Sequence, residues 1–277
     1  MGGEIAQAIA SSGIPVVMKD VKQEFVDHGL EKARQVTEGQ LGGLVKKEKI
    51  TQEQADAQLT EITGRITGAL DYSDFGDVDF VIEAVPEKMA IKHAVFADLD
   101  AVTPGHAILA SNTSGLSITE IGDITQRPDK VVGFHFFWPA SYMRLIEVIE
   151  GEETSPETTQ VAANFAQAIR KMPVRCAECP GFVVNRILAS TASEIWRYQD
   201  ETGTDVEEID RALIEAKLVP MGPFLLADMS GLDTTLKVAR DMQDAYGDRF
   251  YVHQGMVELV EQGNFGRKSG KGFYEYS

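Results

Sequence analysis

The pattern of hydrophobic positions along the chain changes near residue 180. Before that point, short apolar runs rich in β-branched residues alternate with stretches of helical periodicity, which predicts a parallel sheet covered by helices. The stretch 23–47 is long and charged, so we expect this helix to project from the sheet. The predicted strands cover 15–20, 65–70, 80–85, 107–112, 131–137, 144–150 and 173–178, and the predicted helices cover 2–12, 23–47, 51–60, 88–100 and 155–171.

After Cys179 the strand-like alternation stops, and apolar residues recur at helical spacing through Val183, Ile187 and Ile195. This pattern predicts an all-α second domain. We expect its first helix to start at Pro180, because the first turn of a helix does not need the N–H that proline lacks. A chain of 277 residues is longer than most single hydrophobic cores, so we predict an α/β domain over 1–179 and a helical domain over 180–277.

The charge balance narrows the class of partner. Lys and Arg number 26 against 43 Asp and Glu, which gives a formal net charge of −17. Such a surface repels phosphate backbones, so nucleic acid is not expected as a partner. Small anionic ligands stay possible, because a helix start or a single lysine is enough to hold a phosphate.

The sequence shows no membrane segment and no leader peptide. The apolar runs 80–85 and 131–137 are far shorter than the roughly 20 residues that a membrane helix needs. No basic stretch leads into an apolar one near the N-terminus, so a cytoplasmic location is expected. Cys176 and Cys179 have the spacing of half a zinc or redox site, but the five histidines are scattered, so no metal is expected.

The first 20 residues have the pattern of the second half of a Rossmann βαβ unit. A helix beginning at Gly2 turns at Gly13 and continues as a strand that ends in Asp20. In complete units a strand leads into a G-x-G-x-x-G turn beneath the pyrophosphate, and an acid about 20 residues further on binds the ribose hydroxyls. Gly2 then stands for the third glycine, and Asp20 favours NAD over NADP. Taken alone, this pattern also fits α/β proteins that bind no dinucleotide.

The first strand and the first two glycines of such a unit are missing from the sequence. That strand is central in a doubly wound sheet, so its loss exposes apolar helix faces and leaves two inner strand edges unpaired. We therefore expect a truncated gene or a fragment of a longer polypeptide, with weak binding of NAD by the chain as it stands.

Four segments carry polar residues at a spacing typical of one enzyme family. They read SNTS at 111–114, GFHFFWP at 133–139, LIEVI at 145–149 and PGFVVNR at 180–186. Together they resemble the 3-hydroxyacyl-CoA dehydrogenase family, and most of all the dehydrogenase part of bacterial multifunctional fatty-oxidation enzymes. Further matches at 83–92, 220–224 and 266–274 extend the resemblance over essentially the whole chain. The matching site positions are Ser114, His135, Glu147 and Asn185.

The resemblance implies NAD-dependent oxidation of (S)-3-hydroxyacyl-CoA to 3-ketoacyl-CoA in fatty-acid β-oxidation. This reaction needs a base for the hydroxyl proton, and His135 is suited to it because imidazole titrates near working pH. Glu147 would orient the ring and favour the imidazolium. Ser114 and Asn185 would hold the substrate oxygen. By the same resemblance, we expect two further residues near the cofactor, Glu87 and Lys92.

Each of these residues also has a plainer interpretation. A histidine at the end of an apolar strand is usually structural, and Ser or Asn beside a helix start is usually a cap. Glu147 points away from its apolar neighbours, toward either solvent or an imidazole. Glu87 and Lys92 fit the start of a surface helix. Three more lysines could meet the CoA phosphates or simply form a solvated helix face: Lys46, Lys47 and Lys49.

The chain departs from the family pattern at three positions. Trp138 stands where asparagine is usual, so the family pattern does not predict the acyl-chain preference of this protein. Glu4 brings a negative charge within a turn of the expected pyrophosphate, where a small residue is common. Cys179 replaces a polar residue before Pro180, with no expected consequence.

Two other functions fit parts of the pattern. One is a catalytically silent relative that binds NAD or CoA, or an inactive fragment of a multifunctional β-oxidation enzyme. The other is a dehydrogenase of hydroxy acids without CoA, although such enzymes commonly use lysine as the base and lack a His–Glu pair. The helical domain occurs once here and pairs with a second copy in relatives, so we expect a homodimer or removal from a larger fatty-oxidation polypeptide, with an acyl-CoA as substrate.

Overall fold

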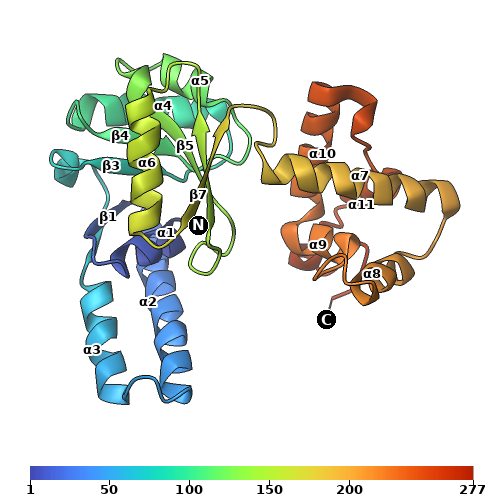
Figure 1. Ribbon diagram of the computed structural model, residues 1–277, viewed down its shortest axis with the longest axis horizontal. Helices are drawn as coiled ribbons and strands as arrows, with labels where there is room; N and C mark the ends of the chain where they lie inside the picture. The colour runs from blue at the N-terminus through green and yellow to red at the C-terminus, as the bar shows by residue number, and fades with distance from the viewer. Residues whose placement is uncertain (277) are drawn as a thin grey trace. The chain divides into compact units, whose positions relative to one another are not determined.

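The computed structural model describes residues 1–276 and divides into two compact units. The first, Met1–Cys179, is an α/β unit, and the second, which begins at Pro180, is built from helices (Figure 1). The predicted class, a Rossmann-like α/β fold followed by an all-α part, is confirmed.

All seven predicted strands are present in the first unit. All five helices predicted for this unit are present as well, and one short α-helix, α5 (Ile118–Asp123), was not predicted because six residues are too few to show a helical period. The strands are β1 (Val16–Lys19), β2 (Ile66–Ala69), β3 (Phe80–Glu83), β4 (Ile108–Ser111), β5 (Val131–Phe136), β6 (Leu145–Glu150) and β7 (Met172–Ala177). The other helices are α1 (Gly2–Ala10), α2 (Gln23–Lys46), α3 (Gln52–Thr63), α4 (Met89–Val102) and α6 (Pro156–Ala168).

The strands form two separate sheets. One has the order β3-β4-β5-β6-β7, and the other contains only β1 and β2. The predicted parallel pairing holds at every strand pair except one, because β5 and β6 pair antiparallel. The connection 137–144 is too short for the crossover that a parallel pair requires.

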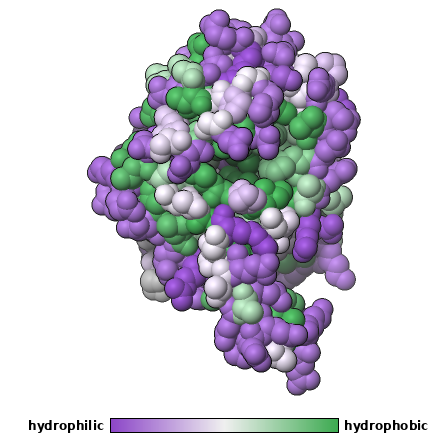
Figure 2. All heavy atoms as spheres, turned by 90° about the vertical axis from the view of Figure 1, so that its left-hand side faces the viewer, coloured by the Kyte–Doolittle hydropathy of each residue, from purple (hydrophilic) through white to green (hydrophobic). Residues whose placement is uncertain are grey.

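The two strands that face the break between the sheets are only half-buried. Within residues 1–276, β1 is hydrogen-bonded only to β2, and β3 is an edge of the larger sheet. Every residue of β1 and the first three residues of β3 keep intermediate exposure, whereas β4 and β5 are buried throughout. Figure 2 shows apolar side chains gathered around a hollow on one face of the molecule, above the projecting helices.

Helix α1 links the two sheets through side-chain packing. Ile5 and Ile9 belong to the same buried cluster as Val132 and Phe134 of the larger sheet. The opposite side of α1 crosses α2 so closely that a Cβ atom on Gly3 would lie 2.4 Å from the carbonyl oxygen of Gly29. Since backbone cannot move aside as a flexible side chain can, this crossing requires glycine at position 3.

Helices α2 and α3 lie side by side and extend away from the sheet, as expected for the charged stretch 23–47 (Figure 1). Thr51 begins α3 with a capping box, in which its hydroxyl accepts from Gln54 and the Gln54 side chain accepts from the Thr51 N–H.

The second unit contains five α-helices in its described part. Their core includes Trp196, Phe224, Leu236 and Met256. The helix expected at Pro180 begins instead at Val184, because Gly181 and Phe182 have φ values of 75° and 47°, which a right-handed helix cannot use. The helices are α7 (Val184–Thr202), α8 (Val206–Glu215), α9 (Pro223–Ser230), α10 (Leu232–Tyr246) and α11 (Gln254–Glu261).

A buried histidine makes the stability of this helical unit depend on pH. His253 caps α11 by accepting the Met256 N–H at its Nδ1, 2.9 Å away, and its Nε2 lies 2.7 Å from Oε1 of Gln199. Burial lowers the pKa of His253, and the opposing effects of Asp200 and Glu258 do not reverse the shift. The unfolded chain therefore binds a proton more readily than the folded chain. The stabilisation is complete above the ordinary pKa of about 6.5 and is lost as pH falls toward the folded value.

We expect the denaturant midpoint of the helical unit to fall between about pH 7 and pH 5, and to fall less in His253→Asn. Asparagine retains a capping oxygen but does not titrate. Fluorescence of Trp196, measured in a Trp138→Phe background, reports unfolding of this unit. Equal loss of stability in both proteins would exclude His253 as the source.

None of the helices in the part of the chain described is long and apolar enough to cross a membrane. Across the same residues, no three His, Cys, Asp or Glu side chains are grouped so that they could hold a metal ion.

Candidate active site

A histidine and a glutamate lie directly opposite each other on the antiparallel strands β5 and β6. The register pairs His135 with Glu147, and the imidazole Nδ1 lies 2.7 Å from the carboxylate Oε2. The Glu147 side chain is fully buried and that of His135 is 8% exposed. Directly opposed residues project from the same face of a sheet, so the hairpin itself creates this pair.

The alternation of side chains along both strands separates this pair from the hydrophobic core. The neighbours Phe134, Phe136, Ile146 and Val148 all belong to the core cluster of the first unit. An ionised carboxylate can only accept hydrogen bonds, so the hydrogen on Nδ1 is directed at Glu147. The contact fixes the orientation of the imidazole ring, with Nε2 on the side away from Glu147.

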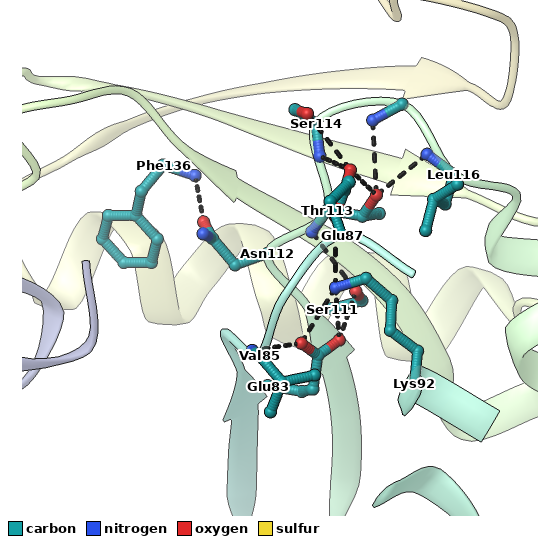
Figure 3. A network of polar contacts seen from close by, with 11 residues as sticks. Glu83, Val85, Glu87, Lys92, Ser111, Asn112, Thr113, Ser114, Leu116 and Phe136 are labelled. Carbon is teal, nitrogen blue, oxygen red and sulfur yellow. Dashed lines mark hydrogen bonds and ion pairs between the residues drawn. The ribbon is translucent and has the colours of Figure 1, made fainter. Parts of the chain in front are cut away.

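A second set of polar side chains lies where β4 ends (Figure 3). The hydroxyl of Thr113 and both the N–H and the hydroxyl of Ser114 donate to Oε1 of Glu87, at 2.6, 2.9 and 3.1 Å. The other oxygen, Oε2, lies 3.3 Å from Nζ of Lys92. Burial raises the pKa of Glu87, but the bonds from Thr113 and Ser114 and the charge of Lys92 together hold it below its ordinary value. Glu87 is therefore a fixed anion beside Ser114.

Lys92 is buried rather than part of a surface helix start. Its ammonium lies 2.9 and 3.0 Å from the two oxygens of Glu83, whose side chain is fully buried. Glu83 also accepts from the N–H of Val85 and the hydroxyl of Ser111. No role was predicted for Glu83 or Ser111 from the sequence. The available signal was a polar residue closing each of two apolar strand runs, since the ends of parallel strands meet at one edge of the sheet.

Gly2 and Asp20 lie at the ends of α1 and β1. Gly2 starts α1 and is exposed, and a Cβ atom there would meet nothing within 4 Å. Asp20 follows β1 and accepts the Val21 N–H at 2.7 Å. The short connection reverses the chain, which brings the start of the helix and the end of the strand to the same edge. Glu4 is buried, with Oε1 3.6 Å from Nζ of Lys32, so a cation partly offsets its charge.

The remaining predicted residue, Asn185, belongs to the helical unit. It is the second residue of α7 and is half-buried. Trp138 lies in the loop after β5 and is 67% exposed. That loop is anchored by Lys171, whose ammonium donates to the carbonyl oxygens of Ala140 and Met143 at 2.6 and 2.8 Å.

A Rossmann-like sheet with an open helix start, an acid after the next strand and a His–Glu pair on a hairpin is typical of a dinucleotide-dependent α/β dehydrogenase. Residues 1–179 match the model of the 3-hydroxyacyl-CoA dehydrogenase NAD-binding domain, and residues 181–276 match that of the C-terminal domain of the same family. The chain belongs to the 3-hydroxyacyl-CoA dehydrogenase family.

Relatives of two lengths are similar to this chain. A probable 3-hydroxybutyryl-CoA dehydrogenase of Deinococcus radiodurans is 41% identical over 100% of this chain and 96% of its own length. The fatty acid oxidation complex subunit alpha of a Psychrobacter species is also 41% identical, but the chain spans only 37% of that protein. The crystal structure of (S)-3-hydroxybutyryl-CoA dehydrogenase from Ralstonia eutropha has a TM-score of 0.91 and 37% identity, and covers 100% of this chain and 95% of that one.

Proposed function

We propose that the chain catalyses the NAD-dependent oxidation of (S)-3-hydroxyacyl-CoA to 3-ketoacyl-CoA, with His135 as the base. The observation that carries this proposal is the 2.7 Å contact between Nδ1 of His135 and the buried carboxylate of Glu147. A buried carboxylate stabilises the imidazolium that forms when Nε2 takes the hydroxyl proton. In the reverse direction the same imidazolium returns the proton to the ketone.

Ser114 and Asn185 are the proposed contacts to the substrate oxygen. Both are neutral hydrogen-bonding groups, so they stabilise that oxygen without competing with His135 for its proton. The hydroxyl of Ser114 is held 3.1 Å from Glu87, so the position of this contact is fixed before substrate binds.

NAD fits the residues at the edge of the first unit. Gly2 at the open start of α1 would hold the pyrophosphate, Asp20 the ribose hydroxyls, and Glu87 the nicotinamide side, with the buried Lys92 acting through Glu87. The nicotinamide of bound NAD would supply the acceptor for the hydride. A carboxylate at position 20 repels a ribose phosphate, which favours NAD over NADP.

A short acyl chain is the proposed substrate class. Two similar proteins of nearly the same length are named 3-hydroxybutyryl-CoA dehydrogenases. Trp138 replaces the asparagine usual in the family beside the active-site strand, and a large exposed ring there would narrow the space for a long chain. Activity with four-carbon and sixteen-carbon substrates compared in the Trp138→Asn variant tests this point.

We propose that residues 180–277 contribute to substrate binding and to a homodimer. Ile187 and Leu188 on α7 are 60% and 52% exposed, and such apolar surface is typical of subunit contacts. Sedimentation of wild type against Ile187→Glu tests the dimer. A protein that remains a monomer in both forms would contradict it, and would favour assembly within a larger polypeptide.

The proposed reaction is tested by following the loss of NADH absorbance with acetoacetyl-CoA. We expect turnover with NADH and acetoacetyl-CoA, and little with NADPH or with free acetoacetate. Turnover of acetoacetate without CoA would favour a hydroxy-acid dehydrogenase. Binding of NADH without any turnover would favour the catalytically silent relative.

A further inference from the structure

We propose that Glu83 is a positioning residue for the cofactor side of the active site. It would act through Lys92 and Ser111 on the loop that carries Ser114. This inference rests on the proposed function, because it assumes that Glu87 and Ser114 face NAD and substrate.

Glu83 is the centre of a fully buried polar cluster (Figure 3). Its two oxygens accept from Nζ of Lys92 at 2.9 and 3.0 Å, from the Ser111 hydroxyl at 2.8 Å and from the Val85 N–H at 2.6 Å. The side chains of Glu83 and Lys92 are 0% and 1% exposed. Neither residue can therefore serve as a solvent-facing ligand group.

Two chains of contacts lead from Glu83 to the same loop. In one, Lys92 lies between Glu83 and Glu87, and Glu87 accepts both hydrogen bonds from Ser114. In the other, Ser111 donates to Glu83 and accepts the N–H of Thr113 at 3.2 Å. The parallel register sets this arrangement, because it pairs Glu83 with Ser111 at the ends of β3 and β4.

Net stabilisation does not explain the burial of this ion pair. Replacing a buried pair by uncharged groups of similar volume is often neutral or stabilising, whereas removing one partner alone is strongly destabilising. What the pair does provide is a defined position for the Lys92 ammonium, and through it for the Glu87 carboxylate. A site that must hold a reacting group within a fraction of an ångström gains from such support.

The test compares single and paired neutralisation. Glu83→Gln alone removes one of the two carboxylates beside the buried Lys92 ammonium. Because a buried charge then loses a partner, this single variant can fail to fold. Glu83→Gln combined with Lys92→Met removes both charges, while glutamine keeps an acceptor for the Val85 N–H. Asp100→Asn is the matched control, because it neutralises another ion pair of α4, that with Arg127 at 2.8 Å, without contacting the loop 111–114.

For the folded paired variant we expect the Kd for NADH and the KM for NAD to rise about tenfold, with the KM for acyl-CoA unchanged. Adding Glu87→Gln to it should weaken NADH binding less than Glu87→Gln does in wild type, because the loop is already displaced. Asp100→Asn should keep the wild-type Kd. Thermal unfolding of each protein verifies that it is folded.

The role of Glu83 would be overturned if the folded paired variant kept the wild-type Kd for NADH. It would also be overturned if Glu87→Gln weakened NADH binding by the same factor in the paired variant as in the wild type. A wild-type chain that does not bind NADH would overturn both this inference and the proposed function. If His135→Gln stays active while the Glu83 variants still bind NADH weakly, the proposed base fails and the role of Glu83 stands.

Discussion

Replacing His135 with glutamine is expected to lower kcat for 3-hydroxybutyryl-CoA oxidation by about a hundredfold to ten-thousandfold. Glutamine retains hydrogen-bonding capacity and similar length but cannot take the hydroxyl proton. The Kd for NADH should stay near its wild-type value, because none of the proposed cofactor contacts changes. Steady-state kinetics and NADH fluorescence titration measure the two quantities.

The control for this substitution is His106→Gln. His106 is exposed, with Nε2 3.1 Å from Oδ1 of Asp79, so the same chemical change there should leave kcat unaltered. A His135→Gln enzyme with at least a tenth of the wild-type kcat would rule out His135 as the base.

Replacing Glu147 with glutamine is expected to lower kcat by about a hundredfold or more, through the orientation and charge of the imidazole. An amide can donate to Nδ1 instead of accepting from it, which would move the ring hydrogen to Nε2 and block proton uptake there. It also removes the negative charge that stabilises the imidazolium. The change is nearly isosteric, so the fold should be retained.

The dependence of Glu147 on His135 is measured with the double variant. If the two side chains act as a unit, His135→Gln with Glu147→Gln should be no slower than the slower single variant. If the reductions in kcat of the two single variants instead multiply in the double variant, Glu147 acts on catalysis independently of His135. Near wild-type kcat in Glu147→Gln would exclude it from the mechanism.

The strand and helix pattern of the first unit was predictable because burial imposes period 2 on strands and a helical period on helices. Helix α5 has too few residues to display its period, and the start of α7 was misplaced because Gly181 and Phe182 adopt positive φ. The antiparallel pairing of β5 and β6 follows from the short connection 137–144. The pattern of apolar residues predicts each strand but does not give the relative direction of two strands.

The site residues divide along similar lines. The spacing of His135 and Glu147 was visible in the sequence, and the hairpin register then determines that they meet. The cluster around Glu83 was indicated only by a polar residue at the end of each of two apolar strand runs, and its contacts were not predictable, because its partners Lys92 and Ser111 come from a helix and from a neighbouring strand. Contacts between parallel strands depend on a register that no local sequence pattern specifies.

The break between the two sheets gives the proposed cofactor two separate supports. Asp20 is carried by the β1–β2 pair, whereas Glu87 and Ser114 follow strands of the five-stranded sheet. No backbone hydrogen bond between strands ties these supports together in residues 1–276, so their spacing depends on side-chain packing, in a cluster that joins Ile5 and Ile9 of α1 and Val16 of β1 to Phe80 and Ile82 of β3. A dinucleotide that contacts both would restrict their relative motion, and part of its binding free energy would be spent on that loss of conformational entropy.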